Sequence, residues 1–214
     1  MILYNTMMGF CAALVLLITS NILKLSQGSF ERLSSTVHGY GLLVAGVPLT
    51  VLSFLMATTW PLKVNLPINI LFAEPSLILG MLAITGGTFL VVNSTRRIKI
   101  NGRVFIWIVA AVGLMLLSCS AAIFRFNVVG DAPSMEPISG QFHGWENTTF
   151  GIIYLIAALS CLALPFTVTD GTLIKLVRYG WNTVGVFFLV FSCLNYYTHM
   201  GLLTCTTKGV CLPW

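Results

Sequence analysis

Apolar residues run through this chain in six long blocks that are separated by short polar connections. Each block has roughly 19 to 23 residues, close to the ~20 that a helix needs to cross the hydrocarbon core of a bilayer. The blocks cover residues 2–23, 39–60, 70–92, 104–124, 150–168 and 181–203. Only helices satisfy their own backbone hydrogen bonds in lipid at this length. The pattern therefore predicts an all-α polytopic membrane protein, a bundle of six transmembrane helices.

Composition supports the same class. Hydrophobic residues make up 57% of the chain and charged residues 8%, too few polar side chains to cover a soluble surface. No hydrophilic run is long enough to form a separate domain, and no period of 20 to 50 residues repeats. Residues 1–214 are thus expected to form one domain that is embedded in the lipid bilayer.

The basic residues predict how the bundle is oriented. Most of them follow the first, third and fifth blocks: Lys24, Arg32, Arg96, Arg97, Lys99, Arg103, Lys175 and Arg178. By the positive-inside rule these connections are cytoplasmic, so both termini face outward. Trp60, Trp107 and Trp181 lie near the predicted helix ends, where indole rings favour the headgroup zone. The net charge of +5 follows from this topology, and we expect no nucleic-acid partner.

Two cysteines follow the last predicted span. Cys205 and Cys211 lie in the outward C-terminal tail. A disulfide between them is predicted if that compartment is oxidising, and two free thiols are the alternative.

Glu74 is the carboxylate most deeply embedded in apolar sequence, and it is followed directly by Pro75. Proline suits the first turn of a helix, which would make Glu74 a helix cap paired with Arg125 at the outward end of the fourth span. The regular third span would then begin near Glu74. The alternative is a role in proton, ion or metal chemistry, because ionisable groups at membrane depth are candidates for function.

Asn195 and His199 lie four residues apart on the sixth span and therefore share one helix face. Together with Glu74 and Arg125 they would form an outward-facing polar pathway in a small transporter or channel. Hydrogen bonds between helices would explain the same stripe.

A metal site is a further hypothesis. His143 and Glu146 lie in an outward loop, Glu136 is nearby, and His199 lies close to the outward end of the sixth span. Imidazole and carboxylate groups that converge can bind a divalent metal, although ordinary hydrogen bonding within the loop accounts for the same residues.

The histidines also bear on cofactors. No two of them lie in spans at one depth, so no internal bis-histidine haem is expected, whereas a single axial histidine for a haem or pigment stays open. Bound lipid is expected.

Residues 147–149 match the sequon for N-glycosylation, a match that is frequent by chance.

The stretch Trp60-Pro61-Leu62, with Asn69, Glu74 and Pro75 downstream, resembles an uncharacterised family of small multi-pass membrane proteins from archaea and bacteria, known only as a domain of unknown function. The resemblance implies a helical membrane domain in a prokaryotic plasma membrane, in which the Glu74-Pro75 element matters. It implies no activity.

Three functions stay open at this point. The first is an integral, non-catalytic subunit of a larger membrane complex, of a bioenergetic kind, because few ionisable groups lie in the spans and no complete cofactor ligand set is present. The second is the small transporter or channel. The third is a metal-dependent membrane enzyme.

Small residues four apart, such as Ala83 and Gly87, suit helix packing within the chain or against partner subunits.

Overall fold

The computed structural model describes residues 3–26, 32–63, 65–96, 103–131, 144–168 and 171–208, and within those ranges the chain is entirely helical apart from short turns. The elements are η1 (Leu3–Met7), α1 (Met8–Leu25), α2 (Arg32–Thr59), α3 (Leu66–Arg96), α4 (Arg103–Phe126), α5 (Trp145–Ala163), η3 (Leu164–Val168) and α6 (Gly171–Lys208). All six α-helices are long and apolar enough to cross a membrane. The prediction of an all-α protein with six such helices is confirmed.

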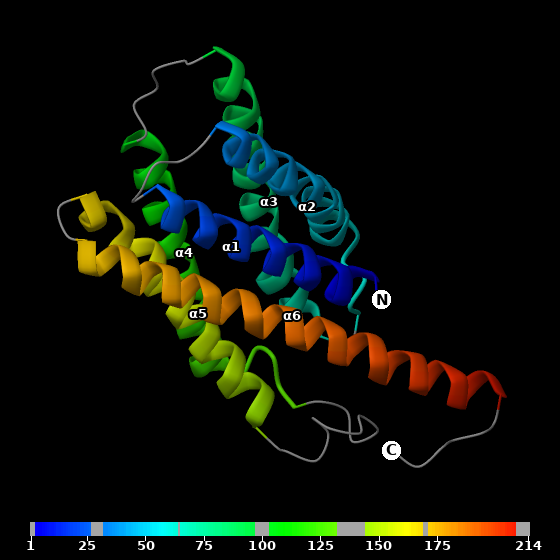
Figure 1. The fold of residues 1–214 in the computed structure, drawn as a ribbon. Coiled ribbons are helices and arrows are strands. Elements are labelled where there is room, and N and C mark those ends of the chain that lie inside the picture. The colour runs from blue at the N-terminus through cyan, green and yellow to red at the C-terminus, as the bar shows by residue number, and fades with distance from the viewer. Residues whose placement is uncertain are drawn as a thin grey trace.

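The helices associate mainly in pairs: α1 with α6, α2 with α3, and α4 with α5 (Figure 1). Gly9 lies beside Ser192, and the Ser20 hydroxyl donates to the Arg178 carbonyl at 3.3 Å, so α1 and α6 are antiparallel. Additional contacts link α1 to α2 and α5 to α6. The α1–α6 pair therefore joins the other two pairs into one bundle.

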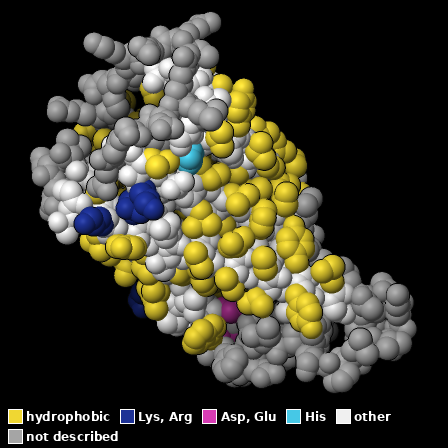
Figure 2. Space-filling model, viewed as in Figure 1, with side chains coloured by type: hydrophobic (Ala, Val, Ile, Leu, Met, Phe, Trp, Pro, Cys, Tyr) yellow, Lys and Arg dark blue, Asp and Glu magenta, His cyan; other side chains and the backbone are white. Residues whose placement is uncertain are grey.

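Charged side chains separate between the two ends of this bundle. The last turns of α1, α3 and α5 and the first turns of α2, α4 and α6 gather at one end (Figure 1). Lys24 lies in the last turn of α1, and Lys175 and Arg178 lie in the N-terminal part of α6. Figure 2 shows Lys or Arg side chains near this end and a small area of Asp or Glu toward the other. This is the charge pattern from which the outward orientation of both termini was derived, and that orientation stays a prediction.

Glycines let α2 and α3 approach closely. A Cβ atom at Gly87 would lie 2.7 Å from the Gly39 carbonyl oxygen, and one at Gly80 would lie 2.9 Å from the Thr50 backbone nitrogen. Lipid provides no hydrophobic drive for helix association, so close backbone packing is what holds such a pair together. Gly87, with Ala83 one turn before it, thus serves packing within the chain.

Gly80→Ala is expected to lower the midpoint of thermal unfolding in detergent by several degrees. The new methyl group would meet backbone atoms of Thr50, and overpacking of this kind costs about 1–3 kcal/mol. Gly86→Ala is the matched control, since its Cβ would meet only the Leu42 side chain at 3.9 Å. The control should unfold at or slightly above the wild-type midpoint. A Gly80→Ala protein as stable as the control would contradict the close approach.

Candidate functional site

Trp60 and Pro61 end helix α2. Trp60 has a positive φ of 48°, and its backbone N–H donates to the Met56 carbonyl at 3.1 Å. Its indole N–H donates to the Ala57 carbonyl at 2.7 Å. Two carbonyls of the last turn thereby gain donors, and Pro61 cannot continue the helix. The Trp-Pro pair is a helix cap.

Asn69 holds the turn that follows. Its side chain is completely buried, its Nδ2 donates to the Leu62 and Leu66 carbonyls, and its Oδ1 accepts the Leu62 N–H, each at 3.0 Å. Leu62 lies between the two helices, so its N–H and carbonyl have no helical hydrogen-bond partners. The Asn69 amide provides a partner for both. The first part of the stretch that carried the family resemblance, Trp60-Pro61-Leu62, thus belongs to the connection between α2 and α3.

Pro75 lies inside α3, which begins at Leu66. The prediction that the regular helix begins near Glu74 is wrong, and Glu74 is not an N-terminal cap. A proline in a helix leaves the carbonyl four residues earlier without its backbone donor. Here that carbonyl belongs to Leu71, and the buried Tyr154 hydroxyl of α5 donates to it at 2.7 Å. The helix continues because a neighbouring helix replaces the missing hydrogen bond.

The Glu74 side chain is exposed on α3. It shares the outer face of the helix with Ile70, Met81 and Thr85, which are also exposed. No ion pair joins it to Arg125, which is exposed in the last turn of α4, or to any other described residue. Its charge acts on the Cys119 thiol of α4. The carboxylate thus lies on the surface that lipid or another protein would cover.

Asn195 and His199 do share a face of α6, as predicted. The His199 Nδ1 donates to the Asn195 backbone carbonyl at 2.8 Å, a contact within the helix. Within the described ranges, neither residue forms a hydrogen bond or ion pair with Glu74 or Arg125. The pathway formed by these four residues stays a prediction.

The proposed metal ligands His143 and Glu136 lie outside the described residues, as does Cys211 of the predicted disulfide. Glu146 lies in the first turn of α5. The backbone of Cys205 belongs to α6, but its side chain lies outside the description. Among the described residues, no three His, Cys, Asp or Glu side chains gather as metal ligands would. The metal site and the disulfide stay predictions.

Asn147, the sequon residue, is buried at the start of α5. Its Oδ1 accepts the Val129 N–H at 3.1 Å and its Nδ2 donates to the Ile123 carbonyl at 3.0 Å. Asn65 similarly donates to the Val128 carbonyl at 2.9 Å. An amide held inside the fold in this way is a structural group and no glycan acceptor. Sequence reasoning missed these asparagines, because their partners are backbone atoms distant along the chain.

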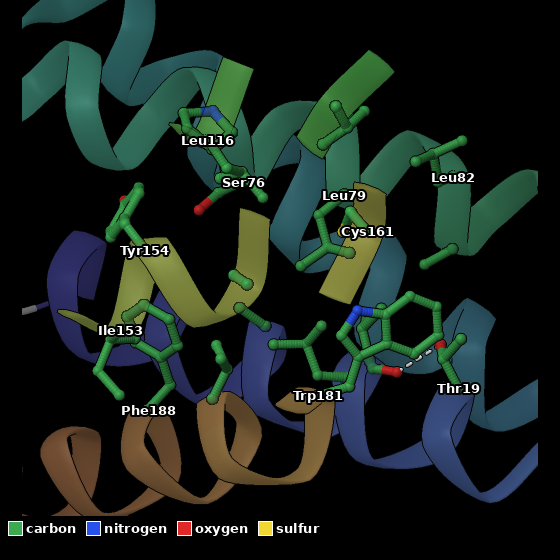
Figure 3. Close-up of a pocket in the computed structure, with 18 of the residues that line it drawn as sticks. Thr19, Ser76, Leu79, Leu82, Leu116, Ile153, Tyr154, Cys161, Trp181 and Phe188 are labelled. Atoms are coloured by element: carbon green, nitrogen blue, oxygen red, sulfur yellow. Dashed lines mark hydrogen bonds between the residues drawn. The ribbon is translucent and has the colours of Figure 1, made fainter. Parts of the chain in front are cut away.

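A cavity of about 170 Å³ lies between α1, α3, α4, α5 and α6. Its lining is almost entirely apolar, and the exceptions are Thr19, Ser76, Tyr154, Cys161 and Trp181 (Figure 3). The Thr19 hydroxyl donates to the Val15 carbonyl at 2.7 Å, and the Tyr154 hydroxyl donates to Leu71. The hydroxyl hydrogens of Thr19 and Tyr154 are thus already used within the protein.

The indole N–H of Trp181 is not used in this way. Only 5% of the residue is exposed, and its indole N–H has no hydrogen-bond partner among the described residues. Cys161, beside it in the same buried cluster, offers only a sulfur, which is a weak acceptor. The ring is therefore packed inside the bundle. Sequence reasoning located Trp181 near a span end, but α6 begins at Gly171, and the ring turns inward.

A comparison with family models identifies the family of this chain. A family model described as a protein of unknown function (DUF981) matches residues 1–201, nearly the whole chain, and confirms the resemblance to an uncharacterised family. Neither a curated protein nor a solved structure matches.

Proposed function

We propose that this chain, which belongs to the DUF981 family of unknown function, is an integral and non-catalytic subunit of a larger membrane complex. The observation that carries the proposal is the exposed Glu74 carboxylate on a helix that crosses the membrane. A charge on such a surface calls for a partner that covers it.

The position of Glu74 along α3 makes its exposure costly. It lies eight residues after Leu66, so the 1.5 Å rise per residue places it roughly 12 Å along the helix. Ile70 and Met81 on the same face are 42% and 56% exposed, as expected of side chains that face lipid. A carboxylate at the centre of a spanning helix costs about 2.5–3.5 kcal/mol on the mildest scales, and Glu74, nearer the helix start, carries part of that cost. A partner subunit that donates a hydrogen bond to Glu74 would remove that cost.

The neighbouring helix offers a suitable surface. Ala111, Ser118 and Ala121 are exposed along α4, and the hydroxyl of Ser118 donates back to the Leu114 carbonyl. Small side chains of this kind allow a partner helix to approach closely in lipid. A docking face that includes Glu74 and this side of α4 is therefore part of the proposal.

The remaining elements of the proposal follow from the sequence. The complex is of the bioenergetic kind and lies in a prokaryotic plasma membrane, with both termini outward and with lipid bound at its surface. A disulfide between Cys205 and Cys211 would close the outward tail. The outward loops would then form a cap over the bundle.

Extraction in a mild detergent, followed by size-exclusion chromatography and mass spectrometry, tests the proposal. The wild-type chain should co-elute with a defined set of other membrane proteins. Glu74→Gln should reduce their recovery roughly ten-fold, because a lost charge-assisted hydrogen bond of ~1.4 kcal/mol changes an equilibrium constant by that factor.

Thr85→Val is the matched control on the same face. The Thr85 hydroxyl donates to the Met81 carbonyl within α3, so its loss should leave the complex intact. A wild-type chain that elutes alone or only with copies of itself would refute the proposal. If Glu74→Gln assembled normally but abolished proton or solute flux, the transporter hypothesis would replace it.

A further inference from the structure

We propose that the cavity binds a small lipid-soluble carbonyl compound, whose carbonyl oxygen accepts a hydrogen bond from the indole N–H of Trp181. This inference concerns a ligand site and does not depend on the assembly proposed above. It rests on the unpartnered donor, on the size and chemistry of the lining, and on the place of the cavity between the helix pairs.

The donor is the first argument. A buried N–H without an acceptor is rare in native proteins, because desolvation costs free energy that no contact returns. The Trp181 indole lines the cavity, is almost fully buried, and makes no hydrogen bond to the described residues. Figure 3 shows its nitrogen on the side of the ring that faces Cys161 and Leu79. An acceptor atom supplied by a ligand would complete the site.

Water does not suit this position. A buried water needs two to four polar partners. The hydroxyl hydrogens of Thr19 and Tyr154 are bound to backbone carbonyls, and Ser76 lies toward the Tyr154 end of the cavity, away from Trp181 (Figure 3). A water at the indole would therefore accept from one N–H and could donate only to hydroxyl oxygens whose own hydrogens are bound elsewhere, in an otherwise apolar space. A neutral molecule with one acceptor and an apolar body fits better.

The size of the cavity limits the ligand further. A volume of about 170 Å³ is slightly larger than the ~150 Å³ engineered apolar cavity that binds benzene. The aromatic side chains in the lining are Phe72, Phe105, Tyr154, Trp181, Phe188 and Phe191. Aromatic rings pack favourably against another flat ring. A substituted benzoquinone ring has the size, the flatness and the carbonyl oxygen that this space calls for.

The position of the cavity gives a lipid-soluble molecule access. Its lining includes Ser76 and Leu79 from α3 and Val112 and Leu116 from α4. α3 packs mainly on α2 and α4 mainly on α5, so the boundary between α3 and α4 is a seam between two helix pairs. A molecule dissolved in the bilayer meets this seam directly. The carbonyl could belong to a quinone ring or to the ester of a membrane lipid, and the experiment distinguishes these two sources.

Isothermal titration calorimetry of the purified full-length chain in detergent tests the inference. Duroquinone should bind saturably, and durene, the same methylated ring without carbonyl groups, should bind about ten-fold more weakly, as expected for one lost hydrogen bond. Diheptanoyl-phosphatidylcholine provides the second arm. Tighter binding of duroquinone identifies the quinone ring as the ligand class, and tighter binding of the phospholipid identifies the lipid ester.

Two variants locate the site. Trp181→Phe removes the N–H and keeps an aromatic ring, and should weaken the preferred carbonyl ligand about ten-fold while leaving durene unchanged. Trp107→Phe is the matched control, because Trp107 is 63% exposed on α4 and outside the cavity lining. Ala157→Leu, which fills the cavity, should abolish binding.

The comparison of duroquinone with durene needs only the wild-type chain. It therefore tests whether a carbonyl group contributes to binding even if a variant fails to fold. Durene that binds as tightly as both carbonyl compounds would overturn the role of Trp181. Absence of saturable binding by either carbonyl compound would overturn the site altogether.

Discussion

Asn69→Ala should lower the free energy of unfolding by about 3 kcal/mol. The substitution removes one amide that serves both the N–H and the carbonyl of Leu62, and each buried backbone group left without a partner costs about 1–3 kcal/mol. The Asn69 side chain is completely buried, so the substitution removes its packing as well as its hydrogen bonds. For a chain of this size the loss corresponds to a fall of roughly 6 to 12 °C in the midpoint of thermal unfolding, measured by differential scanning fluorimetry in detergent.

Asn182→Ala is the control for this experiment. Asn182 is half-buried on α6 and has no hydrogen bond to the described residues, so its removal should change stability by no more than about 0.5 kcal/mol. Equal midpoints for the two variants would show that the turn between α2 and α3 does not depend on the Asn69 amide.

Tyr154→Phe is the second substitution for which we expect a large effect, a loss of about 1–3 kcal/mol of stability. The Tyr154 hydroxyl is the donor that replaces the backbone N–H missing at Pro75, so its removal leaves the Leu71 carbonyl unpaired among buried side chains. Tyr179→Phe is the matched control, because Tyr179 is 67% exposed on α6. Thermal unfolding in the same detergent should distinguish the two.

A double-mutant cycle isolates the cause. In Pro75→Ala, the backbone N–H of residue 75 can donate to Leu71, and the Tyr154 hydroxyl is no longer the only donor available. Tyr154→Phe should then cost less than half of what it costs in the wild-type background. An unchanged cost in the Pro75→Ala background would mean that the hydroxyl does not compensate for the proline.

The stretch from Trp60 to Pro75, which carried the family resemblance, shows how much of the local structure could be predicted from the sequence. The resemblance implied that the Glu74-Pro75 element matters, but not why. Proline followed by apolar residues is as typical of a helix start as of a helix interior, and the sequence pattern favoured the start. The donor that decides between them, Tyr154, lies on α5 and about 80 residues later in the chain.

The number and approximate location of the membrane helices and the separation of charge between the two ends were determined by the sequence alone. Both depend on the free energy of transferring each segment into lipid, which is a sum over residues in one stretch of chain. Other features depended on the tertiary structure. These are the carbonyl that gains a donor from another helix, the carboxylate of Glu74 on the outer face, and the indole of Trp181 turned inward beside a cavity. Each depends on which helix faces come together in three dimensions, and hydropathy contains no information about that choice.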